Sequence, residues 1–190
     1  MNGFSISDQI RILAQAAGII SERGDAVAAK AYFTNSLDLA SRGLPKEDPA
    51  HRDLAITGNN LACALEEKTN RSESEIQLMI LAAKTGRKFW ELAGGPSEIA
   101  SAEYRLSQSY LQASQIEKSF EHAQLSIEAC EEYKCSALDY FFGYEAIALA
   151  EKARKNDSGY LKAVEKIKIY FEQLSEDDKK WCQKTLNKFL

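Results

Sequence analysis

The segment AAGIISERGDAVAAKAYFTNS, residues 16–36, decides the fold because it reads as two helices joined by one tight turn. On both sides of Gly24-Asp25, apolar residues recur at steps of three and four, the spacing of one face of a helix. A Gly-Asp pair is typical of the turn between them. Ala17 is small enough to let two helices approach closely. The segment therefore predicts a helical hairpin.

The composition of the whole chain favours helices. Its 190 residues include 26 Ala and 19 Leu but only 2 Val and 5 Thr. Ala and Leu lose little on entering a helix, whereas strands prefer β-branched residues. The hydrophobic share of 45% is too high for a disordered chain, and 4 Cys are too few for a disulfide scaffold. We therefore expect an all-α protein.

The helical spacing continues to the end of the chain and predicts nine helices without a strand. Gly94-Gly95-Pro96 is the clearest break. Ser7 is the expected N-cap of the first helix, and Ser175, with Asp178 three residues later, that of the last. We expect a single domain over residues 1–190. Its hairpins are predicted at about 7–43, 50–93, 97–134 and 136–174, with a capping helix at 176–189.

Three of the hairpins repeat one pattern. The small residues Ala17, Ala62 and Ser107 lie 45 residues apart. A larger residue follows each of them three positions later, namely Ile20, Leu65 and Tyr110. Small residues are expected where the two helices of a hairpin touch, and the larger ones fill the space beside them.

The repeated pattern resembles the tetratricopeptide repeat (TPR). The first hairpin carries it as Ala16-Ala17, Ile20, Gly24-Asp25 and Ala29-x3-Phe33-x2-Ser36, and the third as Leu106-Ser107, Tyr110 and Ser114-Gln115. The period of 45 exceeds the usual TPR period of about 34, and is closer to the long repeats of kinesin light chains. Asn59 to Ala62, Asn-Asn-Leu-Ala, is similar to a signature of those repeats. HEAT or armadillo hairpins, with periods of about 40–47, are an alternative.

The resemblance implies a TPR-like superhelical stack of about four hairpins with a C-terminal capping helix. Such a stack is a protein–protein interaction module or adaptor that binds a peptide or partner helix in a concave groove. The first helix of each hairpin would line that groove. The candidate groove residues are Asn59, Asn60, Tyr104, Arg105, Gln108, Gln112, Tyr140, Phe141 and Tyr144.

One branch of the TPR family grips a C-terminal carboxylate through five polar residues. Asn60 and Arg105 match two of these positions, while Ala14, Gly18 and Ser101 occupy the other three. The match therefore supports Asn60 and Arg105 as groove contacts and argues against a complete carboxylate clamp.

Catalytic and metal-binding patterns are not found in the sequence. The 2 histidines, His51 and His122, are not part of Glu-x-x-His or of a zinc spacing, and there is no phosphate-binding glycine loop. Cys130 and Cys135 are five apart, so they do not share a helical face. We expect no enzyme, cofactor or metal. A peptide- or ligand-sensing regulator is the first alternative function, and an enzyme on a helical scaffold is the second.

The charge distribution and the cysteines indicate which ligands and which cellular compartment to expect. Residues 1–150 hold 14 basic and 21 acidic side chains, which argues against nucleic acid as a ligand. There is no apolar run long enough to span a membrane, no basic leader and no CxxC pair, so we expect a cytoplasmic protein with reduced thiols. Trp181 and Phe189 near the end make a homodimer possible.

Overall fold

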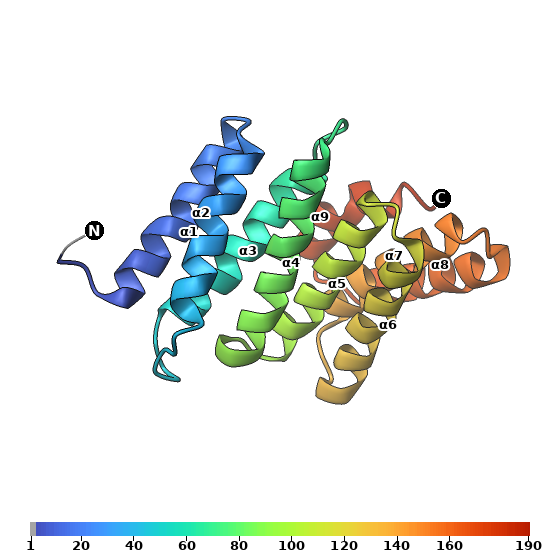
Figure 1. Cartoon of the computed structure of the whole chain (residues 1–190). Coiled ribbons are helices and arrows are strands. Elements are labelled where there is room, and N and C mark those ends of the chain that lie inside the picture. Colours follow the sequence, from blue (N-terminus) through green and yellow to red (C-terminus); the bar gives the residue numbers. More distant parts are fainter. Residues whose placement is uncertain (1–2) are drawn as a thin grey trace. The chain divides into compact units, whose positions relative to one another are not determined.

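The computed structural model describes residues 3–190, and the described part is all-α, with nine helices and no strand (Figure 1). This confirms the predicted fold class. The helices are α1 (Ile6–Glu22), α2 (Ala26–Ala40), α3 (Ala50–Glu66), α4 (Glu73–Ala93), α5 (Pro96–Gln112), α6 (Ile116–Tyr133), α7 (Ala137–Ala153), α8 (Asp157–Glu172) and α9 (Glu176–Leu186).

The chain divides into two compact units, Met1–Gly95 and Pro96–Leu190, at the break that the sequence indicated. In the first unit α1 pairs with α2 and α3 with α4, and the two hairpins touch through α1–α3 and α2–α4 contacts. In the second unit α5 pairs with α6 and α7 with α8, while α7 contacts both α5 and α6. That the two units act as a single domain stays a prediction.

The first helix begins earlier than the sequence suggested. Ser5, rather than Ser7, is the N-cap of α1, and its side chain accepts a hydrogen bond from the backbone N–H of Asp8. Ser7 lies inside the first turn, and its hydroxyl donates to Asp48 Oδ1 at 2.7 Å. Ser7 thereby ties α1 to the segment before α3.

Helices α3 and α4 approach each other backbone to backbone. A Cβ atom on Gly58 would lie 2.6 Å from the Ala82 carbonyl oxygen and 2.7 Å from the Gly86 nitrogen, so no side chain fits there. Gly86 in turn faces the backbone of Asn59. Glycine lowers helix stability in the interior of a helix, and here it permits the contact that holds the hairpin together.

Serines lie between the paired helices of the second unit. Ser107 of α5 and Ser119 of α6 are fully buried, and their hydroxyl oxygens lie 3.2 Å apart within hydrogen-bonding distance. The Ser126 hydroxyl of α6 donates to the Ala100 carbonyl at 2.9 Å. Ser107 thus lies at the contact between the two helices of its hairpin, and Ala17 and Ala62, at the corresponding positions of the repeat, are fully buried.

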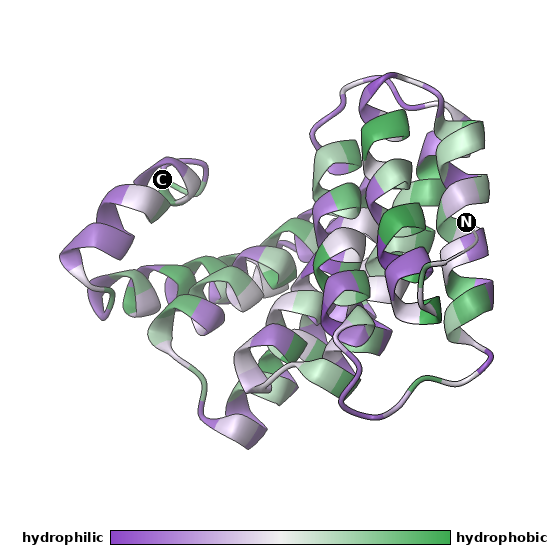
Figure 2. Ribbon diagram, turned by 90° about the vertical axis from the view of Figure 1, so that its left-hand side faces the viewer, coloured by the Kyte–Doolittle hydropathy of each residue, from purple (hydrophilic) through white to green (hydrophobic). Residues whose placement is uncertain are grey.

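Hydrophobic and hydrophilic residues alternate along the helices, and the joining loops are mostly hydrophilic (Figure 2). The largest cluster in the second unit joins Phe141 and Ile167 to residues at the C-terminal end. Cys182 and Leu186 of α9 and the following Phe189 belong to that cluster, so α9 covers its end as a cap.

The burial of Phe189 corrects one expectation about self-association. Phe189 is only 8% exposed and packs against Tyr160, so it is not free to join a dimer interface. Trp181 is 66% exposed, with one edge against Phe142. A homodimer through Trp181 stays a prediction.

Among residues 3–190, we find no helix with the length and apolar character that a membrane crossing requires.

We predict that Gly58→Ala lowers the free energy of unfolding by about 1–3 kcal/mol, because the added methyl group forces α3 and α4 apart. Urea unfolding followed by circular dichroism measures the change. Gly18→Ala in α1 is the matched control, since a Cβ atom there meets nothing within 4 Å. We expect this control to raise stability by up to about 1 kcal/mol. Equal effects of the two substitutions would contradict the packing role of Gly58.

Candidate functional site

A cavity of about 600 Å³ in the first unit opens between α1 and α3. These two helices are the first helices of their hairpins, as the resemblance to TPR stacks implied for a groove. We call this cavity the α1–α3 groove. Its lining residues are Gln15, Gly18, Ile19, Ser21, Glu22, Thr57, Asn60, Leu61, Ala64, Leu65 and Lys68.

Gly18 keeps space open in the groove. It lies inside α1, where a glycine costs roughly 1 kcal/mol of helix stability relative to alanine. Unlike Gly58, it is not required by packing, because a Cβ atom added to Gly18 would meet no atom within 4 Å. A larger side chain at this position would extend into the groove. The effect of Gly18 that the structure shows is therefore the open volume beside it.

The groove combines an apolar floor with a polar rim. Leu61 and Leu65 of α3 are almost fully buried beneath it, whereas the Ile19 side chain of α1 is 52% exposed although it is apolar. Asn60 is exposed on α3, and its side-chain oxygen accepts a hydrogen bond from the Asn59 amide at 3.3 Å. An asparagine amide both donates and accepts, as a bound peptide backbone requires.

A second hollow prolongs the groove along α1. It measures about 320 Å³ and shares Gln15 with the first cavity, and its apolar lining includes the exposed Phe4 and Ile12. Arg11 in this hollow forms an ion pair with Asp53 of α3. The hollowed surface therefore continues along α1 toward Phe4.

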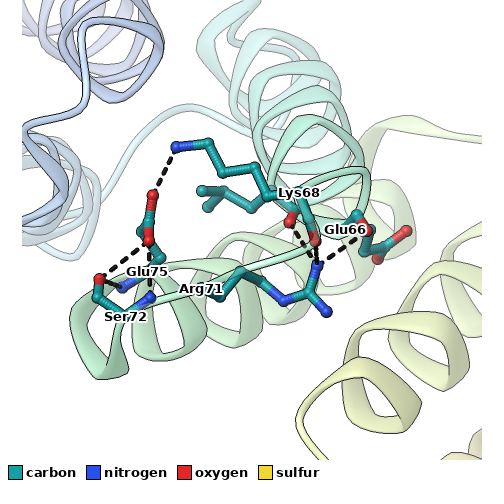
Figure 3. A network of polar contacts seen from close by, with 6 residues as sticks. Glu66, Lys68, Arg71, Ser72 and Glu75 are labelled. Carbon is teal, nitrogen blue, oxygen red and sulfur yellow. Dashed lines mark hydrogen bonds and ion pairs between the residues drawn. The ribbon is translucent and has the colours of Figure 1, made fainter.

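The end of the groove near Lys68 is held by a polar network in the turn between α3 and α4 (Figure 3). The Arg71 guanidinium donates to the backbone carbonyls of Leu65 at 3.1 Å and Glu66 at 3.0 Å, and also to that of Lys68. Arg71 thereby satisfies carbonyl groups that the end of α3 leaves without helical partners. The turn between α3 and α4 is therefore ordered by Arg71, which caps the end of α3.

Glu75 joins Lys68 to the start of α4. Its carboxylate accepts from the Lys68 ammonium group and, at 2.8 Å, from the backbone N–H of Ser72, with which it forms a capping box. The Lys68 hydrogen bond, followed by the Ser72 backbone bond, lowers the pKa of Glu75 from 4.5 to about 2. Lys68 is therefore anchored at the rim by a carboxylate that stays ionised at neutral pH.

The predicted groove residues fall into both units. Asn59 and Asn60 belong to the first unit, and only Asn60 lines the α1–α3 groove. In the second unit, the Tyr104 hydroxyl donates to the buried Glu145 carboxylate at 3.0 Å. The Arg105 guanidinium lies over the Tyr104 ring, 5.7 Å from its centre. Tyr104 and Arg105 are both half-buried.

The aromatic residues of α7 serve mainly in packing. Tyr140 and Tyr144 both stack on Tyr170 from α8, with their ring centres 4.6 and 5.6 Å from that of Tyr170. Phe141 is fully buried against Phe171, which corrects its prediction as a groove residue. Its place in the helix turns it toward α8 and the core. Tyr144 also lines a cavity of about 270 Å³ beside α6.

Two glutamines of α5 differ in exposure. Gln112, the last residue of the helix, is exposed. Gln108 is only 8% exposed, and within residues 3–190 its side-chain nitrogen has no hydrogen-bond partner. As one of the buried residues of α5, Gln108 is not an open surface contact, which corrects the prediction for it.

Residues of α1 were missed by the sequence reasoning. Gln15 and Ile19 line the groove but are not among the predicted residues, and the sequence marks Gly18 only as a departure from the carboxylate clamp. A glycine in the interior of an amphipathic helix was the available signal. Such a glycine either allows a neighbouring helix to pack closely or leaves a cavity. The sequence of a single helix does not show which of these applies.

The two histidines also belong to hairpin packing. The His122 Nδ1 atom lies 2.7 Å from the Glu103 carboxylate, and its ring stacks on Tyr110 at 5.2 Å. His51 stacks on Phe89. In the part of the chain that the structure describes, no three His, Cys, Asp or Glu side chains converge as metal ligands would.

No family model matches the chain, and comparisons with curated proteins and with solved structures find no match either. The class that the fold defines is that of all-α proteins built from helical hairpins.

We predict that Glu75→Gln lowers the free energy of unfolding at pH 7 by about 0.5–1 kcal/mol, because glutamine keeps the cap but loses the ion pair with Lys68. A carboxylate with a lowered pKa stabilises the fold above its unfolded value and loses that effect as the pH falls. The difference from wild type should therefore be complete above pH 4.5 and shrink toward pH 2. Urea unfolding across this range measures it, and a difference independent of pH would contradict the assignment.

Proposed function

We propose that this chain is a TPR-like interaction module that binds a peptide segment of a partner protein in the α1–α3 groove. The observation that carries the proposal is the open volume of about 600 Å³ beside Gly18. Cavities of about 300–1,000 Å³ are typical of ligand-binding sites. Gly18 lowers the stability of α1 and is not needed for a helix contact. Binding of a ligand in the space beside Gly18 would explain why a glycine occupies this position.

The lining suggests how the peptide would bind. An apolar peptide side chain would pack against Ile19 and over Leu61 and Leu65, removing the exposed surface of Ile19 from water. The Asn60 amide on the rim would pair with a peptide N–H or C=O group. These contacts fit an internal segment with a large apolar residue, and they do not need a terminal carboxylate.

A sensing function is the second candidate, since a cavity of this volume also suits a small molecule. The same variants test both functions, because either ligand would occupy the space beside Gly18. For the location, the four free cysteines agree with a reducing compartment, and we propose a cytoplasmic protein.

The first test fills the groove. Peptides are selected from a displayed random library against the wild-type chain, and their affinities are measured by fluorescence anisotropy. Gly18→Phe places a ring in the cavity, so we expect at least about a tenfold loss of affinity, equivalent to 1.4 kcal/mol. Ala31→Phe on α2 adds the same bulk at an exposed position outside the groove and should leave affinity unchanged.

Urea unfolding of both variants shows whether each is folded. Peptides that bind wild type and Gly18→Phe equally would place the binding surface elsewhere. If the library yields no binding peptide while a small-molecule thermal-shift screen finds ligands that Gly18→Phe excludes, the sensing function replaces the peptide-binding one.

A second prediction concerns the rim. Asn60→Ala should weaken the selected peptides about threefold to tenfold, the effect of losing one or two neutral hydrogen bonds. Asn35→Ala, an exposed asparagine of α2, is the matched control and should have no effect. Equal affinities of wild type and Asn60→Ala would remove Asn60 from the binding site, even if Gly18→Phe still blocks the groove.

A further inference from the structure

Cys130 and Cys135 lie together at the end of α6, although their spacing suggested that they would not. The helix ends at Tyr133, and Lys134 adopts a left-handed conformation with φ of 54° that reverses the chain. As a result, the backbone N–H of Cys135 donates to the Cys130 carbonyl at 3.1 Å. The Cys135 side chain packs against the small cluster that contains Cys130, and its thiol donates to the Ala129 carbonyl at 4.0 Å.

The two thiols differ in exposure. Cys130 is fully buried in a small cluster with Ala100 and Ala129. Cys135 is half-buried at the edge of that cluster. A reagent from solvent therefore reaches Cys135 first, and Cys130 is positioned behind it as the second, resolving thiol.

We propose that Cys130 and Cys135 are an oxidative modification site that forms a reversible intrachain disulfide on contact with a disulfide oxidant such as oxidised glutathione. The backbone hydrogen bond between the two residues already closes the turn that the disulfide would span. This proposal is independent of the peptide-binding function, because the cysteines lie in the second unit and the groove in the first.

The reaction proceeds by two exchanges. The Cys135 thiolate attacks one sulfur of oxidised glutathione, a Cys135–glutathione disulfide forms, and one glutathione thiolate leaves. The Cys130 sulfur then attacks the Cys135 sulfur, the Cys130 proton passes to the departing glutathione sulfur, and the second glutathione leaves. In sum, two protein thiols are oxidised to one disulfide, and oxidised glutathione is reduced to two molecules of glutathione.

The surroundings make this reaction slow. Burial raises the pKa of both thiols, and the Asp139 carboxylate raises it further, with Glu131 adding to the effect at Cys130. A hydrogen bond with Ser97 acts in the opposite direction at Cys135. Since only the thiolate attacks a disulfide, the pair is reduced by default and responds to sustained oxidant.

The experiment uses the full chain, treated with excess oxidised glutathione at pH 8.5 and then blocked with iodoacetamide. We expect the intact mass before blocking to fall by about 2 Da, and dithiothreitol to restore it. Lys134 lies between the two cysteines, so trypsin cleaves the chain within the ring. Peptides 119–134 and 135–152 should then be recovered as one linked species without reductant, and as two separate peptides with it.

Two variants complete the test. Cys135→Ser changes a half-buried position and should abolish the linked species, whereas Cys63→Ser should leave it intact. The oxidised wild type should also melt at a higher temperature than the reduced protein, because the ring restricts the unfolded chain. A lasting glutathione adduct of about 305 Da on Cys135, full alkylation of both thiols, or a link to Cys63 or Cys182 would overturn the proposal.

Discussion

The close approach of paired helices is the constraint on which the rest of the structure depends. At Gly58 the backbones of α3 and α4 are in contact, with no room for even one methyl group. Between α5 and α6 the small residues Ser107 and Ser119 meet, with their hydroxyl oxygens 3.2 Å apart. Small side chains at these points let each hairpin pack tightly, and the larger apolar residues then fill the space on either side.

Tight hairpins determine where a binding surface can form. At Gly58 the two helices of a hairpin leave no space between them, and the cavity of about 600 Å³ lies instead between α1 and α3, where two hairpins meet. Two glycines of the first unit have opposite effects on packing. Gly58 lets two helices touch, whereas Gly18 has no neighbour and leaves a space. At the rim of that space, Arg71 and Glu75 order the turn between α3 and α4. Arg71 donates to carbonyl groups at the end of α3, and Glu75 accepts from the backbone at the start of α4.

Much of the fold was predictable from local patterns. Helix spacing, Gly-Asp turns and serine caps are local signals, and they placed the helices within a few residues. For the candidate site, Asn60 was predicted because it precedes Leu61-Ala62, which lies at the repeated position, and it lines the α1–α3 groove. Phe141 and Gln108 were misplaced because aromatic and amide side chains suit a groove or a core equally well, and only the packing of neighbouring helices decides which they face.

The sequence by itself determined an all-α chain of helical hairpins, because helix periodicity and small contact residues act between near neighbours in the chain. Tertiary structure alone decided which helix faces enclose a groove, since that depends on contacts between separate hairpins. It also brought Cys130 and Cys135 together: their spacing excludes contact within a regular helix, and only the left-handed turn at Lys134 reverses the chain to allow it. Residues five apart in sequence thus became neighbours through a backbone conformation that side-chain patterns do not record.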